Sequence, residues 1–579
     1  MITRGRFFCY QNEYRGTVLF WGALLVAAVI VLNENVRRFG QFVTPGGVGT
    51  AARVLLYAGV IYLGLLWVNT GGRFFCYHPP VLKLAAVFFA VYLIYLLIYY
   101  PGVMYWDTMR QIADFFDGYT TGPYFAVPET TISAWLNDHD GAFDTILFGL
   151  FISFGNLFRS PNLGMFLYCV IQAALFALLF AHIIGVMREN GCPRWLTTAA
   201  TVFFLHPFVC YYAIMMLKDV LFALCFLPYF LAFVRVTRGE ADRKTLVRLV
   251  VFSLLCALTK KPGVYIVVLS NLVLLAKTVL AGKKPAQVIT KEPSPCYQSD
   301  NKRTVPVLSP VLSAVVLPAL VVLVLFPKVV FPALQIYPGG KEEVLAVCLQ
   351  TTAVLVTEYE DTLTEEDKQI IDRVMHYDRL AESYLPHTAD WPKYWFRLDA
   401  PASDVAAYLK FWVRKGFRHP LVYLRTVCAL NGGFFSPTEA LEIYISANPV
   451  TDDINYPGMG NLKATLTLRE DLERLYGILS ETPPFSFFFQ NVLYTWIIPA
   501  CTAILMIAQN RKRDLVCLVP VLMSVLVLIA GPESTTRFAT HLIFLAPFIA
   551  GLALDGTVPE QKDGAEADEI MTEAKAAAV

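Results

Sequence analysis

The sequence has 579 residues, of which 56% are hydrophobic and only 16% are charged, and its mean hydropathy is +0.52. A soluble chain of this length would carry about a quarter charged residues, so the composition indicates a protein that lies in a lipid bilayer. The formal net charge of +1 gives no bulk attraction to nucleic acid, which we exclude as a partner.

Roughly a dozen apolar runs come close to the length of about 20 residues with which a helix crosses the hydrocarbon core. The run at 246–259 is short and would need a thinned or protein-lined part of the bilayer. We therefore expect an all-α polytopic membrane protein with about twelve transmembrane helices. The expected spans are 17–33, 51–69, 81–100, 162–187, 195–214, 219–236, 246–259, 263–280, 307–331, 489–508, 515–531 and 537–554.

The basic residues of the short loops predict the orientation, because Lys and Arg gather on the cytoplasmic side of bacterial membrane proteins. If the N-terminus is cytoplasmic, every strongly basic short loop falls on that side. The sequence thus predicts a multi-pass protein of the bacterial cytoplasmic membrane with both termini in the cytoplasm. The basic positions on this side are Arg4, Arg6, Arg15, Arg188, Arg194, Arg235, Arg238, Arg243, Lys244, Arg248, Lys283, Lys284, Lys302, Arg303, Arg511, Lys512 and Arg513.

This topology divides the chain into five regions. They are an N-terminal pair of transmembrane helices (1–80), a transmembrane core (81–331) with an external loop at 101–161, a mainly helical extracytoplasmic domain (332–487), C-terminal transmembrane helices (488–555) and a disordered cytoplasmic tail (556–579).

Both external regions contain predicted helices. The loop has a short helix after Asp107 and an amphipathic stretch at 142–157 that lies on the membrane or dips into it. In the domain, the expected helices are 341–357, 365–375 with a capping box of Thr364 and Asp367, 404–415 between Ser403 and Gly416, and 466–478.

Charged residues stand at the outer ends of several apolar helices, where the orientation rule makes basic residues rare. A charge within the membrane is costly, so such residues usually face a cavity or a partner. Four converging cations would bind an anionic group such as a lipid phosphate. The alternative is that Lys218 and Lys260 reach the outer head groups and Asp219 caps a helix. The residues are Lys218, Asp219, Lys260, Lys261, Glu533 and Arg537.

Asp107 follows the third span and stands among aromatic residues. Pro101 and Gly102 end the helix before it, which leaves the carboxylate just outside the membrane. In such a partly desolvated setting, a carboxylate can accept a proton from an attacking hydroxyl. The alternative is that Asp107 is the N-cap of the helix that it precedes.

The external loop also carries three carboxylates and an imidazole within seven residues, at Asp138, His139, Asp140 and Asp144. Such a group can bind a divalent ion, and its oxygen ligands favour Mg²⁺ or Mn²⁺, with Asp138 and Asp140 as candidate ligands. The alternative is that Asp140 caps the amphipathic helix.

Several stretches resemble the GT-C superfamily of membrane glycosyltransferases, which includes protein O-mannosyltransferases and lipid A aminoarabinose transferases. The chain looks closest to a bacterial family of polytopic proteins of uncharacterised function that is related to this superfamily. The stretches are YPGVMYWDTMRQ (100–111), NDHDGAFDTILFGLF (137–151), LKDVLFALCFL (217–227), KKPGVYIVVL (260–269), EEVLAVCLQTTAVLV (342–356) and YLKFWVRKGFRHPLVYL (408–424).

The resemblance implies a role for each matching position. Asp107 becomes the catalytic base, and the donor phosphate is expected near Lys218, Lys260, Lys261 and Arg537. Substrate contacts are expected at Arg110, Gln111, Asp138, His139 and Asp219. Where the family usually has His followed by Pro, this chain has His139 followed by Asp140 and Gly141, which puts the role of His139 in doubt. The resemblance implies no required cofactor, and it leaves open whether the site binds a divalent cation.

The function that the resemblance implies is transfer of a sugar from a polyprenyl-phosphate donor to an envelope glycan, lipid or protein outside the cytoplasmic membrane. One alternative is a transporter or lipid flippase, although a transporter would place charges near the midplane and repeat its broken helices in two halves. The other is a non-catalytic scaffold of envelope assembly, in which Asp107 is dispensable.

Overall fold

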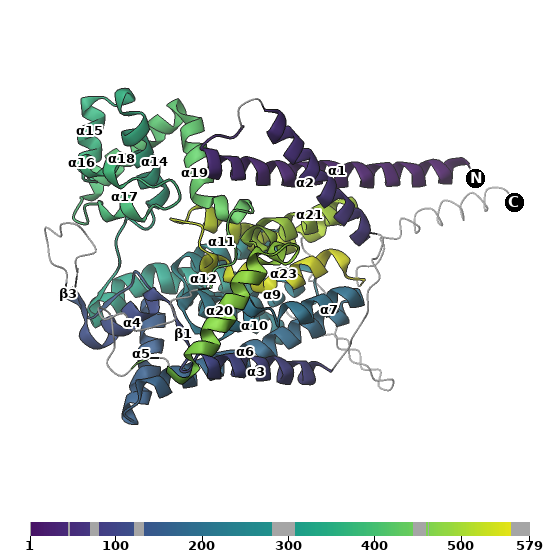
Figure 1. Cartoon of the computed structure of the whole chain (residues 1–579), viewed down its shortest axis with the longest axis horizontal. Helices are drawn as coiled ribbons and strands as arrows, with labels where there is room; N and C mark the ends of the chain where they lie inside the picture. The colour runs from purple at the N-terminus through teal and green to yellow at the C-terminus, as the bar shows by residue number, and fades with distance from the viewer. Residues whose placement is uncertain are drawn as a thin grey trace.

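The computed structural model describes residues 2–43, 47–69, 80–120, 133–280, 307–443, 459–460 and 463–556. Helices make up most of this part of the chain, and the strands in it are two residues long (Figure 1). The expected all-α class is therefore confirmed. The predicted tail lies outside the described residues from 557 onward, as does the basic linker 281–306.

Within the described residues, eight helices are long and apolar enough to cross a membrane, or up to nine if one bent pair is a single span. The chain thus has the helices of a multi-pass membrane protein. The eight are α1 (Ile2–Phe39), α2 (Val48–Asn69), α3 (Val81–Ile98), α6 (Pro161–Glu189), α9 (Lys218–Thr237), α11 (Lys261–Leu280), α12 (Leu308–Leu320) continued by η1 (Val321–Val330) and α13 (Phe331–Leu334), and α23 (Thr540–Leu554) with the preceding turn η7 (Thr536–Ala539).

The expected count of twelve is not confirmed, because four predicted runs form short or interrupted helices. The run at 195–214 is bent by 57° between two helices, and Pro207 begins the second of them. The run at 246–259 gives a helix of 17 residues. The elements concerned are α7 (Arg194–Phe203), α8 (Pro207–Ala213), α10 (Arg243–Thr259), η5 (Leu493–Ile497) with α21 (Ile498–Ala508), and η6 (Lys512–Leu518) with α22 (Val519–Ile529).

Aromatic side chains fill the centre of the bundle around α6 and α23. Phe180 stacks on Phe204 with ring centroids 4.2 Å apart, and Phe544 meets Phe180 edge to face at 5.3 Å. These contacts join α6, the α7–α8 bend and α23 in one core, which also takes in α9. His206, at the bend, accepts a hydrogen bond at Nδ1 from the Phe208 amide and serves as the cap of α8.

Short parallel strand pairs hold the loop between α3 and α6, which the sequence predicted to be external, against the bundle. Val103 pairs with Met215, and Leu136 pairs with Ile336. The elements of the loop and their partners are β1 (Val103–Met104), α4 (Trp106–Asp117), β2 (Tyr119–Thr120), β3 (Ser133–Ala134), β4 (Leu136–Asn137), α5 (Ala142–Leu157), β5 (Met215–Met216) and β6 (Ile336–Tyr337). Since β1 and β5 are parallel and in register, the residues that follow them, Asp107 and Lys218, emerge at the same end of the pair.

The expected helix at 142–157 is confirmed as α5, which packs tightly on α6 through two glycines. A Cβ added at Gly164 would lie 2.1 Å from the carbonyl oxygen of Phe151, and one at Gly155 would lie 2.5 Å from the Gly164 amide nitrogen. Only glycine permits this backbone approach.

The helices α14 to α18 gather at one end of the molecule, away from the start of α1 (Figure 1). They enclose their own core, which includes Leu349, Ile371 and Phe411. The helices of this region are α14 (Ala346–Glu358), η2 (Glu360–Thr362), α15 (Glu365–Asp372), α16 (Tyr377–Ser383), α17 (Asp390–Tyr394), α18 (Ala402–Arg418) and α19 (Pro420–Phe435).

The predicted helices of the domain are largely confirmed. The capping box of Thr364 and Asp367 is present at the start of α15. The predicted ends of α18 were wrong, since the helix begins after Pro401 and continues through Gly416. The helix α20 (Leu466–Glu481), with the turns η3 (Lys463–Thr465) and η4 (Phe485–Phe489), packs on the bundle instead, because Tyr476 belongs to the core of the bundle.

Candidate functional site

Asp107 lies in the first turn of α4 and is not the cap of this helix. The N-cap is Tyr105, whose carbonyl oxygen accepts the first helical hydrogen bonds, and the N-cap alternative for Asp107 is therefore wrong. The neighbouring Thr108 donates its hydroxyl hydrogen to the carbonyl of Met216, at 2.7 Å. This bond continues the β1–β5 pairing and directs the Asp107 carboxylate toward α9.

Two cations from distant segments meet the carboxylate of Asp107. Its Oδ2 lies 2.5 Å from Nη1 of Arg537 and 2.9 Å from Nζ of Lys218. Asp107 is 8% exposed, and the side chains of Lys218 and Arg537 are 14% and 13% exposed. Lys218 thus points inward to a partner, and the alternative that it reaches the outer head groups is wrong.

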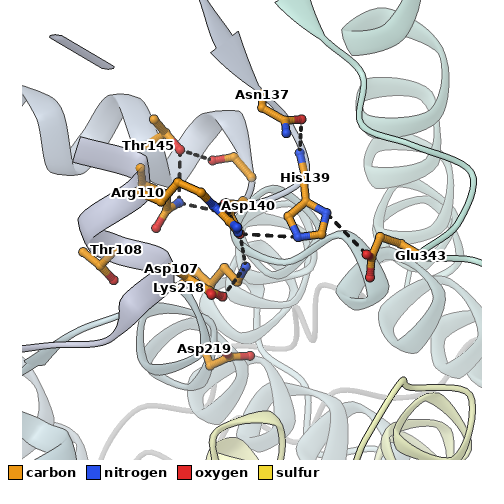
Figure 2. Close-up of polar contacts among 12 residues, drawn as sticks. Asp107, Thr108, Arg110, Asn137, His139, Asp140, Thr145, Lys218, Asp219 and Glu343 are labelled. Carbon is orange, nitrogen blue, oxygen red and sulfur yellow. Dashed lines mark hydrogen bonds and ion pairs between the residues drawn. The ribbon is translucent and has the colours of Figure 1, made fainter. Parts of the chain in front are cut away.

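Asp140 extends this network into the turn before α5 (Figure 2). One of its carboxylate oxygens lies 2.8 Å from Nζ of Lys218, and the other lies 2.6 Å from Nη2 of Arg110. Gln111 donates hydrogen bonds to the backbone carbonyl of Asp140 and to the hydroxyl of Thr145, both at 3.0 Å. Arg110, Asp140, Lys218 and Asp107 thus form one continuous chain of ion pairs.

The N-cap position of α5 is Gly141, so the alternative that Asp140 caps this helix is wrong. The amide of Ala142 donates to Oδ1 of Asp138 at 2.9 Å. The other oxygen of Asp138 lies 2.8 Å from Nζ of Lys261. Lys261 also donates to the carbonyl of Pro338 at 3.0 Å.

Lys260 and Asp219 form a separate pair beside this chain. Nζ of Lys260 lies 2.5 Å from Oδ1 of Asp219, and it also lies 5.2 Å from the centre of the Phe538 ring. The alternatives for these two residues are wrong, because Lys260 has an inward partner and Asp219 makes no helix cap. No direct contact joins the pair to Asp107 among the described residues.

The cations lower the pKa values of both central carboxyl groups. Burial alone would raise the pKa of Asp107, but Arg537, Lys218 and Arg110 hold it well below its usual range. Burial likewise opposes the ionisation of Asp140, yet Lys218 and Arg110 lower its pKa to about 2. Both groups are therefore anions at neutral pH, and Asp107 is a weak base in this state.

The candidate metal ligands Asp138 and Asp140 are engaged by basic side chains. A different group in the described part of the chain has the spacing of a metal site, namely His139, Glu342 and Glu343, whose ligand atoms lie within 4.8 Å of one another. Glu343 already accepts hydrogen bonds from Nζ of Lys393 at 2.9 and 3.0 Å.

Glu342 is the member of this group with an uncommitted carboxylate oxygen. It is 2% exposed, and its Oε2 has no hydrogen-bond partner among the described residues. Burial raises the pKa of Glu342 to about 7. Burial also lowers the pKa of His139, although Asp140 and Glu343 oppose this effect, so the imidazole favours its neutral, ligating form.

Sequence reasoning missed three contributors to the site. Tyr105 lies under the guanidinium of Arg537, with 4.4 Å between the guanidinium carbon and the ring centre. Glu343 lies 3.7 Å from Nδ1 of His139, and Lys393 pairs with Glu343. The position of Tyr105, two residues before Asp107, could have indicated its role. Nothing near Glu343 or Lys393 in the sequence indicates which residues they contact.

One family profile, described as a family of unknown function (DUF6020), matches residues 81–283 and 302–568 of the chain. No curated protein and no solved structure matches. The match begins at Val81, so α1 and α2 lie outside it. Because the matched segments cover well over half of the sequence, the chain belongs to the DUF6020 family.

Proposed function

We propose that the chain is a membrane glycosyltransferase of GT-C type that moves a sugar from a polyprenyl-phosphate donor to an acceptor on the extracytoplasmic face. The observation that carries the proposal is the meeting of Asp107, Lys218 and Arg537, which come from three separate segments. A carboxylate and two cations at the ends of apolar helices supply a base and a phosphate site at the depth of a lipid head group.

The reaction follows from these charges. An acceptor hydroxyl loses its proton to Asp107, and its oxygen forms a bond to the anomeric carbon of the donor sugar. The bond from that carbon to the phosphate oxygen breaks, and polyprenyl phosphate leaves with one more negative charge than it had in the donor. Lys218 and Arg537 stabilise this developing charge, which is the kind of interaction that lowers a transition state.

The ion pairs also link donor binding to the strength of the base. Arg537 and Lys218 hold the pKa of Asp107 low against the effect of burial, and so Asp107 attracts protons weakly when no donor is present. A donor phosphate competes for the same two cations. When they turn toward the phosphate, the pKa of Asp107 rises, and the base gains strength only with the donor in place.

The experiment compares the envelope glycans of a deletion strain complemented with the wild-type chain, with Asp107→Asn or with Asp117→Asn. Asp117 ends α4, is exposed and provides the same chemical change outside the ion-pair network. We expect Asp107→Asn to give the glycan profile of the deletion strain and Asp117→Asn to give that of the wild type. Membrane extraction and size-exclusion chromatography check that both variants fold.

The same comparison separates the other candidate functions. If folded Asp107→Asn restores the wild-type glycans, the network around Asp107 is structural, and the chain is a scaffold of envelope assembly. If the deletion removes the glycan and the polyprenyl-linked sugar accumulates on the cytoplasmic side, the chain is a flippase. Loss of the product together with accumulation of the donor on the outer face supports transfer.

A further inference from the structure

A cavity of about 290 Å³ lies between α6, α9 and α10, at the end of the bundle away from Asp107. Its basic lining residues are His182, Arg235 and Arg248, one from each helix. Arg235 is 17 positions along α9 from Lys218, which corresponds to about 26 Å at the helical rise per residue. The cavity and the candidate site thus lie near opposite faces of the bilayer.

The acidic neighbours of the cavity's basic side chains are exposed. Arg235 forms an ion pair with the carboxylate of Glu189 at 3.7 Å, and the Glu189 side chain is 70% exposed. The exposed Asp242 lies within electrostatic range of both Arg235 and Arg248. Arg248 forms no ion pair with the residues that the structure describes. His182 is exposed on the apolar helix α6 and lies within electrostatic range of both arginines. The residues that line the cavity therefore include cations and no carboxylate.

Apart from Thr245, the remaining walls of the cavity are apolar. Leu179 and Val186 line it from α6, and Phe252 lines it from α10. Pro228 lines it from the middle of α9, where its ring removes one helical hydrogen bond. An apolar recess with cations at its mouth matches an amphiphile whose anionic group lies at the membrane surface and whose acyl chains lie along the helices.

From this combination we infer that the cavity binds an anionic phospholipid, with the head-group phosphate between Arg235, Arg248 and His182. Arginine suits this role because its guanidinium forms paired hydrogen bonds to phosphate oxygens. The inference does not depend on glycosyl transfer, because the cavity and Asp107 share no residue. It assigns a lipid-binding site to the leaflet opposite to the candidate active site.

The test measures binding of lipids to the purified full-length chain in detergent, by native mass spectrometry and by thermal unfolding. The probes are phosphatidylglycerol, phosphatidylcholine, a polyprenyl phosphate and inorganic phosphate. We expect phosphatidylglycerol to bind and to raise the unfolding temperature more than the other three. The double variant Arg235→Gln/Arg248→Gln should lose about tenfold or more in affinity for phosphatidylglycerol.

Two variants control for charge and for folding. Arg243→Gln removes an exposed cation from the same end of α10 outside the cavity and should bind phosphatidylglycerol like the wild type. Arg235→Lys/Arg248→Lys keeps the charge and should restore most of the affinity. Equal binding of phosphatidylcholine and phosphatidylglycerol, preference for polyprenyl phosphate, or undiminished binding by the double Gln variant would each overturn the assignment.

Discussion

Lys218 is the residue that joins the two central carboxylates of the candidate site. Its ammonium group lies 2.9 Å from Asp107 and 2.8 Å from Asp140, and only 14% of the side chain is exposed. A buried ion pair adds little stability relative to an apolar pair, but removal of one partner leaves an uncompensated charge. The stability of the loop that carries Asp107 and Asp140 should therefore depend on this single ammonium.

We predict that Lys218→Met lowers the free energy of unfolding by about 3–5 kcal/mol, because Asp107 and Asp140 then share fewer cations. Lys218→Arg keeps the charge and should cost clearly less. Denaturation of both purified variants in detergent, followed by tryptophan fluorescence, provides the comparison. A Met variant as stable as the Arg variant would mean that solvent or other cations already neutralise the two carboxylates.

Glu342 gives the site a dependence on pH. Burial raises its pKa to about 7, above the value of about 4.3 for an unfolded chain. Folding thus favours the protonated form. The stability that this group contributes is complete below about pH 4 and is lost as the pH rises through about 7.

Glu342→Gln should therefore stabilise the protein at pH 8, by at most about 4 kcal/mol, and do so much less at pH 5, by about 1 kcal/mol. The measurement is the unfolding temperature of the variant and the wild type at both pH values, with a chelator present so that no metal binds the carboxylate. The matched control is Glu343→Gln, which loses the contact with Lys393 and should destabilise the protein at both pH values. An equal loss from both variants at both pH values would contradict this account.

At the scale of the elements, α5 depends on its contact with α6. A methyl group at Gly164 would meet the α5 backbone at 2.1 Å, and no side-chain rotation relieves a backbone clash. Since Thr145 of α5 accepts the hydrogen bond of Gln111, displacement of α5 also disturbs the network around Asp140.

Gly164→Ala should accordingly lower the unfolding temperature, with a cost of about 1–3 kcal/mol or more from overpacking. Gly59→Ala on α2 is the control, because no atom lies within 4 Å of the added Cβ and alanine favours a helix. We expect the control to be neutral or slightly stabilising. If the two variants behave alike in thermal unfolding, the close approach of α5 and α6 does not hold in the protein.

The elements also show how far the sequence could predict the structure. Apolar runs and local capping signals act within a few residues, and so the capping box at Thr364 and the helix α5 were predictable. The bend between α7 and α8 follows from His206 and Pro207, yet hydropathy averages over such a break. The bond from the Ala142 amide to Asp138 joins α5 to the segment after β4, and β4 pairs with a strand about 200 residues later, which no local pattern records.

The charged character of the candidate site was predictable from the sequence, but the pairing of its residues was not. Charges at the ends of apolar helices are costly, and this cost indicated that Lys218, Lys260 and Arg537 have partners. The partners themselves come from distant segments, as with Asp107 and Arg537, which are 430 positions apart. Tertiary packing determines these partners. The sequence therefore predicted one group of four cations, whereas the structure separates Lys260 and Lys261 from Asp107.

At the scale of the whole molecule, the proposals require that the two ends of the bundle face different compartments. The turn between α9 and α10, at Gly239 and Glu240, adjoins the arginine-lined cavity, whereas α16 belongs to the helices that gather at the other end (Figure 1). The basic loops predict that the first end is cytoplasmic.

We predict that a cysteine in place of Glu382, on α16, reacts with a membrane-impermeant maleimide in intact cells. A cysteine in place of Glu240 should react only after the membrane is permeabilised. Both glutamates are exposed, and the two changes are chemically identical, so compartment alone distinguishes them. The wild-type chain supplies the background, because the cysteines that the structure describes are buried or half-buried. Labelling of Glu240→Cys in intact cells, with Glu382→Cys protected, would invert the topology and place Asp107 in the cytoplasm, where the proposed extracytoplasmic transfer could not take place.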